Sequence, residues 1–285
     1  MTTAATETPS RAIIHRTRGG THGPITRLVS PTDLGQFLKP FVFLVLFSFK
    51  PGLGRGLSMH PHSGVATLTV MTEGDVSYED TTGKKGVLPV GGVEWLRTGS
   101  GIWHTATPVG DSRVRGFQLW VALPASEEIA PAESMYLLPG QIPQEGPARV
   151  LLGQYGQAQS PIPAPGTMTY LTVRLKNGER WRYTPPTDHM VAWVAVNEGQ
   201  LAAGNNRGGP IAAGELAVFD ESVQAIDFVA HGETAFVLGS AVKHPYELEI
   251  GYHSIHTTRE ARLQGEAEIE RIGARLREEG RLEHR

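Results

Sequence analysis

Three histidines have the spacing expected of a metal-binding site. His60 and His62 are separated by one proline, and His104 follows a glycine-rich stretch at residues 99–101. Because alternate side chains of a strand share one face, His60 and His62 should point the same way. A third imidazole from a neighbouring strand would complete one face of a coordination sphere, and imidazole suits several divalent transition metals. The spacing predicts a metal site; the alternative is three structural histidines, because a His-x-His pair also occurs by chance.

The composition narrows the chemistry that the chain can perform. Its 285 residues include no cysteine, which excludes a disulfide framework, a zinc ribbon, an iron–sulfur cluster and a catalytic thiol. Histidines and carboxylates are then the only strong metal ligands. The formal net charge is −3, from 26 Lys and Arg against 29 Asp and Glu. Such a balance gives no electrostatic footprint for DNA or RNA, so we expect no direct nucleic-acid binding.

The longest apolar run, at residues 41–49, is too short to cross a membrane as a helix. It has nine residues (FVFLVLFSF), whereas a helix needs about 20 to span the bilayer core. The polar N-terminus lacks the apolar centre of a signal peptide. We interpret the run as a buried strand and expect a cytoplasmic protein without membrane contact.

Most of the chain has the pattern of short strands separated by turns. The clearest strand candidates are residues 65–72, 86–90, 117–123, 169–175, 190–196, 217–219 and 235–238. Asn177-Gly178, between two apolar runs, predicts a hairpin. Short strands at regular spacing favour a β-sandwich or barrel over alternating strands and helices.

Prolines between residues 124 and 165 divide the chain into two halves, each of a size suited to one small barrel. The predicted organisation is a flexible tail at residues 1–11, a first barrel at 12–125, a Pro-rich linker at 126–150, a second barrel at 151–257 and a helix at 258–285. A faint internal repeat, TVMTEGDV at 69–76 and VAVNEGQL at 194–201, indicates two copies of one barrel.

The C-terminal segment differs from the rest because its apolar residues follow helical spacing. These residues are Leu263, Ala267, Ile269, Ile272 and Leu276. They predict an amphipathic helix that packs its apolar stripe on a barrel.

The remaining histidines and tryptophans favour structural roles. His189 lies in the second half, which contains no His-x-His pair, so we expect a second barrel without metal. His253 and His256 are interpreted as surface residues or as packing residues between the two barrels. Core or rim positions are expected for Trp95, Trp103 and Trp120.

Six short motifs surround the three histidines. They are HPHSG at residues 60–64, EG at 73–74, YED at 78–80, GGVEW at 91–95, TGSGIWH at 98–104 and QLWV at 118–121. This series resembles the pirin family of the cupin superfamily, over about residues 12–280. The resemblance implies an all-β fold with two antiparallel cupin (jelly-roll) β-barrels in one chain, a C-terminal α-helix, and a metal in the first barrel alone.

The resemblance also implies a ligand set from which this chain departs. Family members hold the metal with three histidines, which carry over to His60, His62 and His104, and with one glutamate. The glutamate position is Ala106 here, and a second family carboxylate position is Ala66. By strand periodicity both alanines should face the histidines. Such a pocket would be more cationic and would lack the expected general base.

The family resemblance implies a quercetinase-type dioxygenase acting on a small aromatic or enolic substrate. A non-catalytic protein that responds to a metal or ligand remains an alternative, as does a degenerate cupin that holds no metal. Iron is the metal we expect, with manganese, cobalt, nickel, copper and zinc open. A small-molecule ligand and a protein partner are both possible, a monomer is expected because closed barrels leave few strand edges, and no catalytic residue is assigned.

Overall fold

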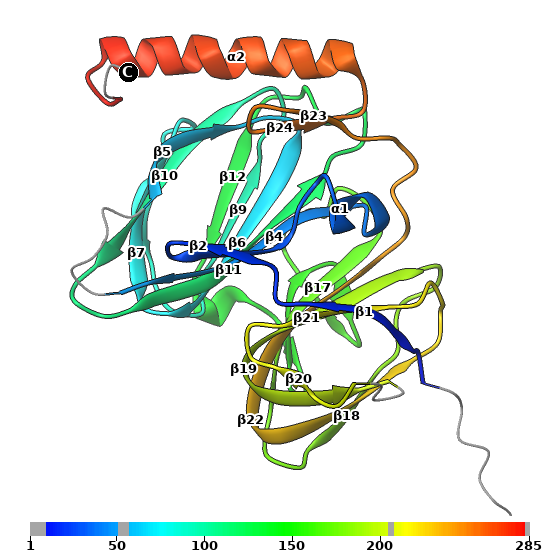
Figure 1. Cartoon of the computed structure of the whole chain (residues 1–285). Coiled ribbons are helices and arrows are strands. Elements are labelled where there is room, and N and C mark those ends of the chain that lie inside the picture. Colours follow the sequence, from blue (N-terminus) through cyan, green and yellow to red (C-terminus); the bar gives the residue numbers. More distant parts are fainter. Residues whose placement is uncertain (1–9, 51–56, 205–207, 283–285) are drawn as a thin grey trace, which may run out of the picture. The chain divides into compact units, whose positions relative to one another are not determined.

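The structure is a computed structural model that describes residues 10–50, 57–204 and 208–282. The chain folds into antiparallel strands and one long helix (Figure 1). Contacts divide it into two units. The N-barrel unit comprises Gly19–Pro143, Ser160–Gly166 and Lys243–Arg285. The C-barrel unit comprises Met1–Arg18, Gln144–Gln159 and Thr167–Val242. The all-β fold class and the C-terminal helix are confirmed. Within the described residues, no helix has both the length and the apolar character that crossing a membrane requires.

The N-barrel unit contains two principal sheets. The larger has the order β12-β9-β6-β11-β4-β3-β2, with β2 (Gly20–His22), β3 (Ile25–Val29), β4 (Phe41–Phe49), β6 (Val65–Glu73), β9 (Val93–Arg97), β11 (Val114–Ala122) and β12 (Glu133–Leu137). The smaller has the order β5-β10-β7-β8, with β5 (Leu57–His62), β7 (Asp75–Asp80), β8 (Lys85–Leu88) and β10 (Ile102–Val109). One core cluster joins Phe47 and Met71 of the larger sheet to Val76 and Leu88 of the smaller, so the two sheets pack face to face.

Shorter elements complete this unit. They are α1 (Leu34–Phe37), the 3₁₀ turn η1 (Pro139–Gln141), the hairpin β23 (Glu249–Gly251) and β24 (Ser254–His256), and α2 (Arg259–Glu278). The apolar run at residues 41–49 is β4, which confirms the predicted buried strand.

The C-barrel unit is built on one nine-stranded sheet. Its main path is β1-β21-β19-β22-β17-β14-β13, and β18 and β20 pair with β22 and β19. The strands are β1 (Ile13–Thr17), β13 (Gln144–Glu145), β14 (Ala148–Leu152), β17 (Met168–Leu175), β18 (Arg180–Tyr183), β19 (Val191–Ala203), β20 (Ile211–Ala212), β21 (Leu216–Phe219) and β22 (Ile226–Ala241), with a separate pair β15 (Gln154–Tyr155) and β16 (Ala158–Gln159). A single large cluster that includes Trp181, Phe228 and Phe236 forms its core.

The internal repeat corresponds to a shared local structure. Gly74 and Gly199, the glycines of the two Glu-Gly motifs, have φ angles of 70° and 74°. A Cβ at either position would lie 2.3 Å from a backbone oxygen, that of Arg113 or Glu233. The two units therefore use glycine for the same reason, a left-handed turn pressed against a neighbouring strand.

The unit boundaries differ from the predicted ones. Residues 12–18 belong to the C-barrel unit because β1 pairs with β21. The segment predicted as a linker divides at Pro143, and its first part contributes β12 to the larger sheet of the N-barrel unit by pairing with β9. Arg11, placed in the predicted tail, is fully buried, and its Nε donates to the carbonyl of Asp220 at 2.5 Å; residues 1–9 lie outside the described residues. Composition alone missed these pairings because they depend on distant strands.

The predicted hairpin at Asn177-Gly178 is wrong. The strands on either side, β17 and β18, both pair antiparallel with β22, so the chain continues along one partner instead of reversing. Gly178 has φ 76° and donates its N–H to the carbonyl of Ala230. A positive φ serves a bulge as well as a hairpin turn, and the length of β22 decides between them here.

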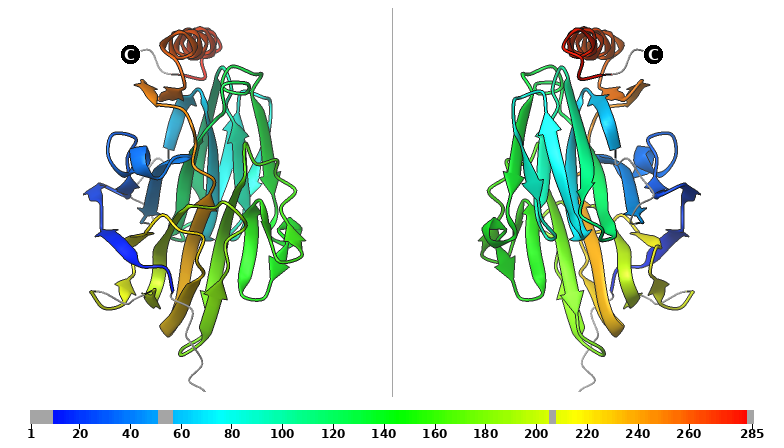
Figure 2. Two further views of the ribbon diagram at one scale, coloured as in Figure 1. Left: turned by 90° about the vertical axis from the view of Figure 1, so that its right-hand side faces the viewer. Right: turned by 90° about the vertical axis from the view of Figure 1, so that its left-hand side faces the viewer.

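Helix α2 begins after Thr258, whose hydroxyl accepts from the backbone N–H of Ala261. The predicted helix is confirmed, but part of its predicted packing face is wrong, because Leu263 is 51% exposed. The buried side includes Gly265 instead, where a Cβ would lie 2.1 Å from Ser63 Oγ. Small residues allow the helix to lie close to the barrel beside β23 and β24 (Figure 2).

Candidate metal centre

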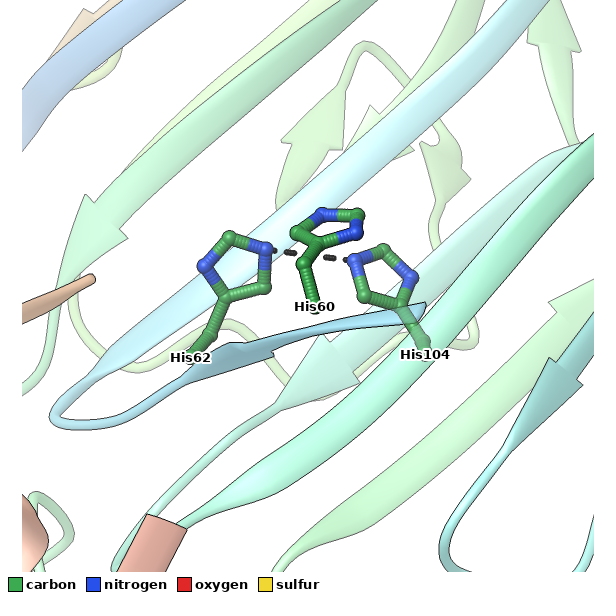
Figure 3. A group of neighbouring side chains, drawn as sticks. All are labelled: His60, His62 and His104. Atoms are coloured by element: carbon green, nitrogen blue, oxygen red, sulfur yellow. Dashed lines mark hydrogen bonds between the residues drawn. The ribbon is translucent and has the colours of Figure 1, made fainter. Parts of the chain in front are cut away.

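The three histidines come together from two neighbouring strands (Figure 3). His60 and His62 lie on β5, His104 lies on β10, and the antiparallel register places His104 directly opposite His60. Cross-strand partners on one face have side chains within reach of each other. The ring centroids are 4.4 Å apart for His60 and His104, 4.9 Å for His60 and His62, and 5.1 Å for His62 and His104.

The donor geometry fits a bound cation. One ligand nitrogen from each ring lies within 4.8 Å of the others, and the Nε2 atoms of His62 and His104 are 3.2 Å apart. Two nitrogens at the usual metal–nitrogen distance of about 2.1 Å are about 3.0 Å apart when they subtend a right angle at one ion. The three histidines could hold a metal ion, and they are the single such group of three or more among the residues that the structure describes.

Hydrogen bonds at the far nitrogens direct the ligand nitrogens toward one another. His60 Nδ1 lies 2.8 Å from the carbonyl oxygen of Ser58, to which it donates, and His104 Nδ1 lies 3.1 Å from Oε1 of Glu94. With Nδ1 protonated, each ring presents an Nε2 lone pair, which is the form that binds metals. His62 Nδ1 is buried and has no hydrogen-bond partner within the described part of the chain.

Burial keeps the imidazoles of His60 and His62 uncharged. It lowers the pKa of His60 to about 3, helped by the nearby ring of His104. Burial, and then the ring of His60, hold the pKa of His62 well below its usual value of 6.5. Neutral imidazole is the ligand form, so these two rings are ready to bind a cation at neutral pH.

Glu94 connects the centre to a buried network. This carboxylate on β9 is 4% exposed, and its Oε2 accepts from the hydroxyl of Thr69 at 2.8 Å. The phenol of Tyr136 lies 2.8 Å from Oδ2 of Asp80 and 3.4 Å from Oε1 of Glu94. Burial, followed by the charges of Glu94 and Asp80, raises the pKa of Tyr136, so the phenol remains a proton donor.

None of these network residues was predicted from the sequence to belong to the site. Glu94 and Asp80 occur in the quoted motifs but carry no ligand spacing, and Tyr136 lies in the segment predicted as a linker. The charged side chain of Glu94 between the apolar residues Val93 and Trp95 is the signal that could have identified it.

Two spaces of very different size adjoin the histidines. An inner cavity of about 30 Å³ is lined mainly by apolar side chains, together with His104 and Glu94. An outer cleft of about 630 Å³ lies between β5 and α2 and is lined by His60, Trp103 and His253, among others. Since about 10–15 Å³ holds one water molecule, the inner cavity has room for about two or three waters, whereas the cleft matches pockets for drug-sized ligands.

The two alanines differ in their relation to the site. Ala106 lines the inner cavity together with His104, as the strand periodicity predicts, so the position of the family carboxylate faces this space. Ala66 is fully buried on β6, but it lines neither the cavity nor the cleft.

The predicted core or rim positions of the three tryptophans are confirmed. Trp95 and Trp103 are buried, and Trp120 is half-buried with its ring edge-on to His62 at 4.8 Å.

Two further histidines have defined places in the N-barrel unit. His256 is buried, with Nε2 3.1 Å from Ser63 Oγ, so it packs within the N-barrel unit and not at the surface or between the barrels as predicted. The ring of His253 lies 6.0 Å from that of His62 and 6.3 Å from that of His60. Nothing in the sequence placed His253 near the other histidines, because it is far from them along the chain.

Comparisons with known proteins agree with this fold. The pirin family model matches residues 24–121. Two Pseudomonas aeruginosa proteins, each named "Putative quercetin 2,3-dioxygenase", are 30% and 33% identical over 75% and 73% of this chain and 79% and 76% of their own lengths. Pirin-1 of Arabidopsis thaliana is 31% identical over 65% of this chain and 64% of its own length.

Solved structures share the architecture. A quercetin 2,3-dioxygenase from Acinetobacter baumannii superposes with a TM-score of 0.84 at 21% identity, covering 92% of this chain and 97% of that one. A bacterial pirin from Escherichia coli, solved in complex with nickel(II), gives 0.64 at 18% identity over 82% of this chain and 96% of that one. This fold of two cupin barrels and the sequence relatives agree: the chain belongs to the pirin family.

Proposed function

We propose that the chain binds one divalent transition metal ion, iron in the first instance, through His60, His62 and His104. We further propose that it catalyses the oxygen-dependent cleavage of a small aromatic or enolic molecule, as a quercetinase does. The observation that carries the proposal is the convergence of three imidazoles beside a cleft of about 630 Å³. The relatives named for quercetin 2,3-dioxygenase activity support the substrate class.

The chain's own residues divide the work. The three imidazoles would hold the ion, which would supply Lewis acidity at this site. Glu94 orients His104 and offsets part of the cation's charge. The apolar lining of the inner cavity keeps bulk water from the inner side. Since Ala106 replaces the family's proton acceptor, the substrate is expected to bind already ionised or to lose its proton to another group.

Metal analysis and turnover test this proposal together. Protein purified without chelator, and apoprotein reconstituted anaerobically with Fe, Mn, Co, Ni or Cu, should hold about one ion per chain, and His60→Ala should lose it. The wild type should then consume O₂ with a flavonol. If metal content is unchanged in His60→Ala, the assigned site is wrong; if no metal supports turnover, the enzymatic part fails.

The absence of a carboxylate at Ala106 favours a second candidate, a non-catalytic protein whose metal or ligand alters its binding to a protein partner. This candidate predicts metal binding without flavonol turnover. Affinity capture from a lysate with metal-loaded and metal-free protein, the His60→Ala variant serving as control, should recover a partner in one metal state. Equal recovery in both states, or none, would count against it.

A further inference from the structure

A fourth imidazole stands at the open side of the three-histidine centre. His253 occupies the tip of the β23–β24 hairpin, where its φ is 53°. A positive φ is uncommon for a residue other than glycine, although His tolerates it better than bulky or β-branched residues do. The turn therefore keeps a large polar ring at a position where glycine would be conformationally easier.

The hairpin is attached to the chain directly after His62. The backbone N–H of Ser63 donates to the carbonyl of His253 at 3.1 Å, and the N–H of Ile255 donates to the carbonyl of Ser63 at 3.2 Å. A Cβ at Gly64 would lie 2.1 Å from the oxygen of Ile255, so the contact requires glycine there. These bonds set the position of His253 relative to the centre.

Distances place His253 outside the ligand set. The three ligand rings are 4.4–5.1 Å apart, whereas His253 is 6.0 Å from His62 and 6.3 Å from His60. The added separation leaves room between this ring and the centre for the oxygen of a bound water or substrate. His253 and His60 line the same outer cleft. A water or substrate that enters through this cleft would therefore supply the oxygen.

The outer cleft is also where an organic substrate fits. The inner cavity, at about 30 Å³, is too small for any aromatic molecule, whereas the cleft has about 630 Å³. Trp103 and Tyr252 contribute aromatic surface to the cleft walls. Rings of this kind favour a flat aromatic guest.

We propose that His253 hydrogen-bonds to the metal's non-protein ligand, a water or the ionised hydroxyl oxygen of a planar aromatic substrate bound in the outer cleft. In this position it orients the exchangeable ligand, in the absence of a carboxylate at Ala106. The inference rests on the metal site of the proposed function and adds a residue that contacts the ligand.

Azide binding to the cobalt(II)-loaded protein tests this directly, because azide occupies an open metal position and its binding changes the cobalt absorption spectrum. The wild type is compared with three variants. His253→Gly suits the positive φ, and His253→Gln restores a hydrogen-bond donor. His22→Gly, at an exposed histidine, is the control. Circular dichroism checks that each variant is folded, and cobalt affinity is measured by calorimetry.

The cobalt affinity of His253→Gly should stay within about threefold of the wild-type value. Its azide dissociation constant should rise about threefold to tenfold, because one hydrogen bond to the azide is lost. His253→Gln should recover part of this loss, and His22→Gly should match the wild type. Unchanged azide affinity in His253→Gly overturns the inference, and so does a cobalt-loaded wild type that binds no azide. Cobalt loss as complete as in His60→Ala also overturns it, because His253 would then be a ligand. A wild type that binds no cobalt refutes the proposed metal site itself.

Discussion

Replacing Glu94 by glutamine removes one negative charge while keeping an oxygen that can accept from His104 Nδ1. The carboxylate oxygen is one hydrogen bond of 3.1 Å and one imidazole ring from the ligand nitrogen. That path puts it roughly 7 Å from an ion at the usual metal–nitrogen distance. The attraction between a dication and a carboxylate at roughly 7 Å is about 5 kcal/mol at an effective dielectric constant of 20 and about 1 kcal/mol in water.

We therefore expect Glu94→Gln to weaken metal binding by about 10- to 100-fold, or about 1.4–2.7 kcal/mol, the range typical of partners that orient metal-ligating histidines. The melting temperature of the metal-free variant should be no lower than that of the wild type, because a buried carboxylate is costly to desolvate. Glu94→Ala, which removes the acceptor as well, should lose more.

Calorimetric titration of metal-free protein with Co(II) measures the effect, and Glu79→Gln is the matched control. Glu79 lies on β7, which pairs with the His104 strand β10; its side chain is 43% exposed and pairs with Arg281. Metal affinity in Glu94→Gln within twofold of the wild type would refute the electrostatic argument. An equal loss in Glu79→Gln would show that the effect is not specific to the network.

Two further predictions concern stability. Gly265→Ala should lower the free energy of unfolding by about 1–3 kcal/mol in urea titrations, because the added Cβ would overlap Ser63 Oγ. This loss should exceed the gain expected from the higher helix propensity of alanine. A stabilised variant, or an equal loss in Gln264→Ala on the exposed side, would contradict the close packing of α2. Burial lowers the pKa of His189 and of His244 to about 4, so between pH 6.5 and 4 the unfolded chain binds more protons than the folded one. The free energy of unfolding should decrease as the pH is lowered across this window, by at most about 1.4 kcal/mol per pH unit for each histidine. His189→Gln should make this decrease smaller. A free energy of unfolding that stays constant or rises on acidification would refute the assignment.

The core of the site was accessible from the sequence because it depends on local periodicity. His60 and His62 share a face by the two-residue repeat of a strand, and the motifs around His104 resembled one family. The structure brings these rings together, while metal binding by them stays a prediction. The fold class followed in the same way, from strand spacing and turn residues.

The parts that were missed depend on pairing between distant segments. Tyr136 reaches the network because β12 adds to the sheet beside β9, and His253 reaches the centre because Ser63 binds the hairpin tip. Local composition does not encode either contact. The same limit explains two wrong predictions. The hairpin at Asn177-Gly178 does not form because the long strand β22 pairs with the strands on both sides of it. The buried face of α2 differs because the helix approaches the barrel closely at Gly265.

The N-barrel unit takes its last elements from residues beyond Val242, and the C-barrel unit takes β1 from residues before Gly19. During synthesis, β1 must wait for β21 to emerge from the ribosome before it can pair. A nascent chain that ends at Val242 already carries all three histidines but neither the β23–β24 hairpin nor α2. Multidomain chains usually fold one complete domain after another during synthesis. This protein cannot do so, because segments of the two units alternate along the sequence. The outer cleft, whose lining includes Tyr252, His253 and residues of α2, can form only after residues beyond Val242 have been synthesised.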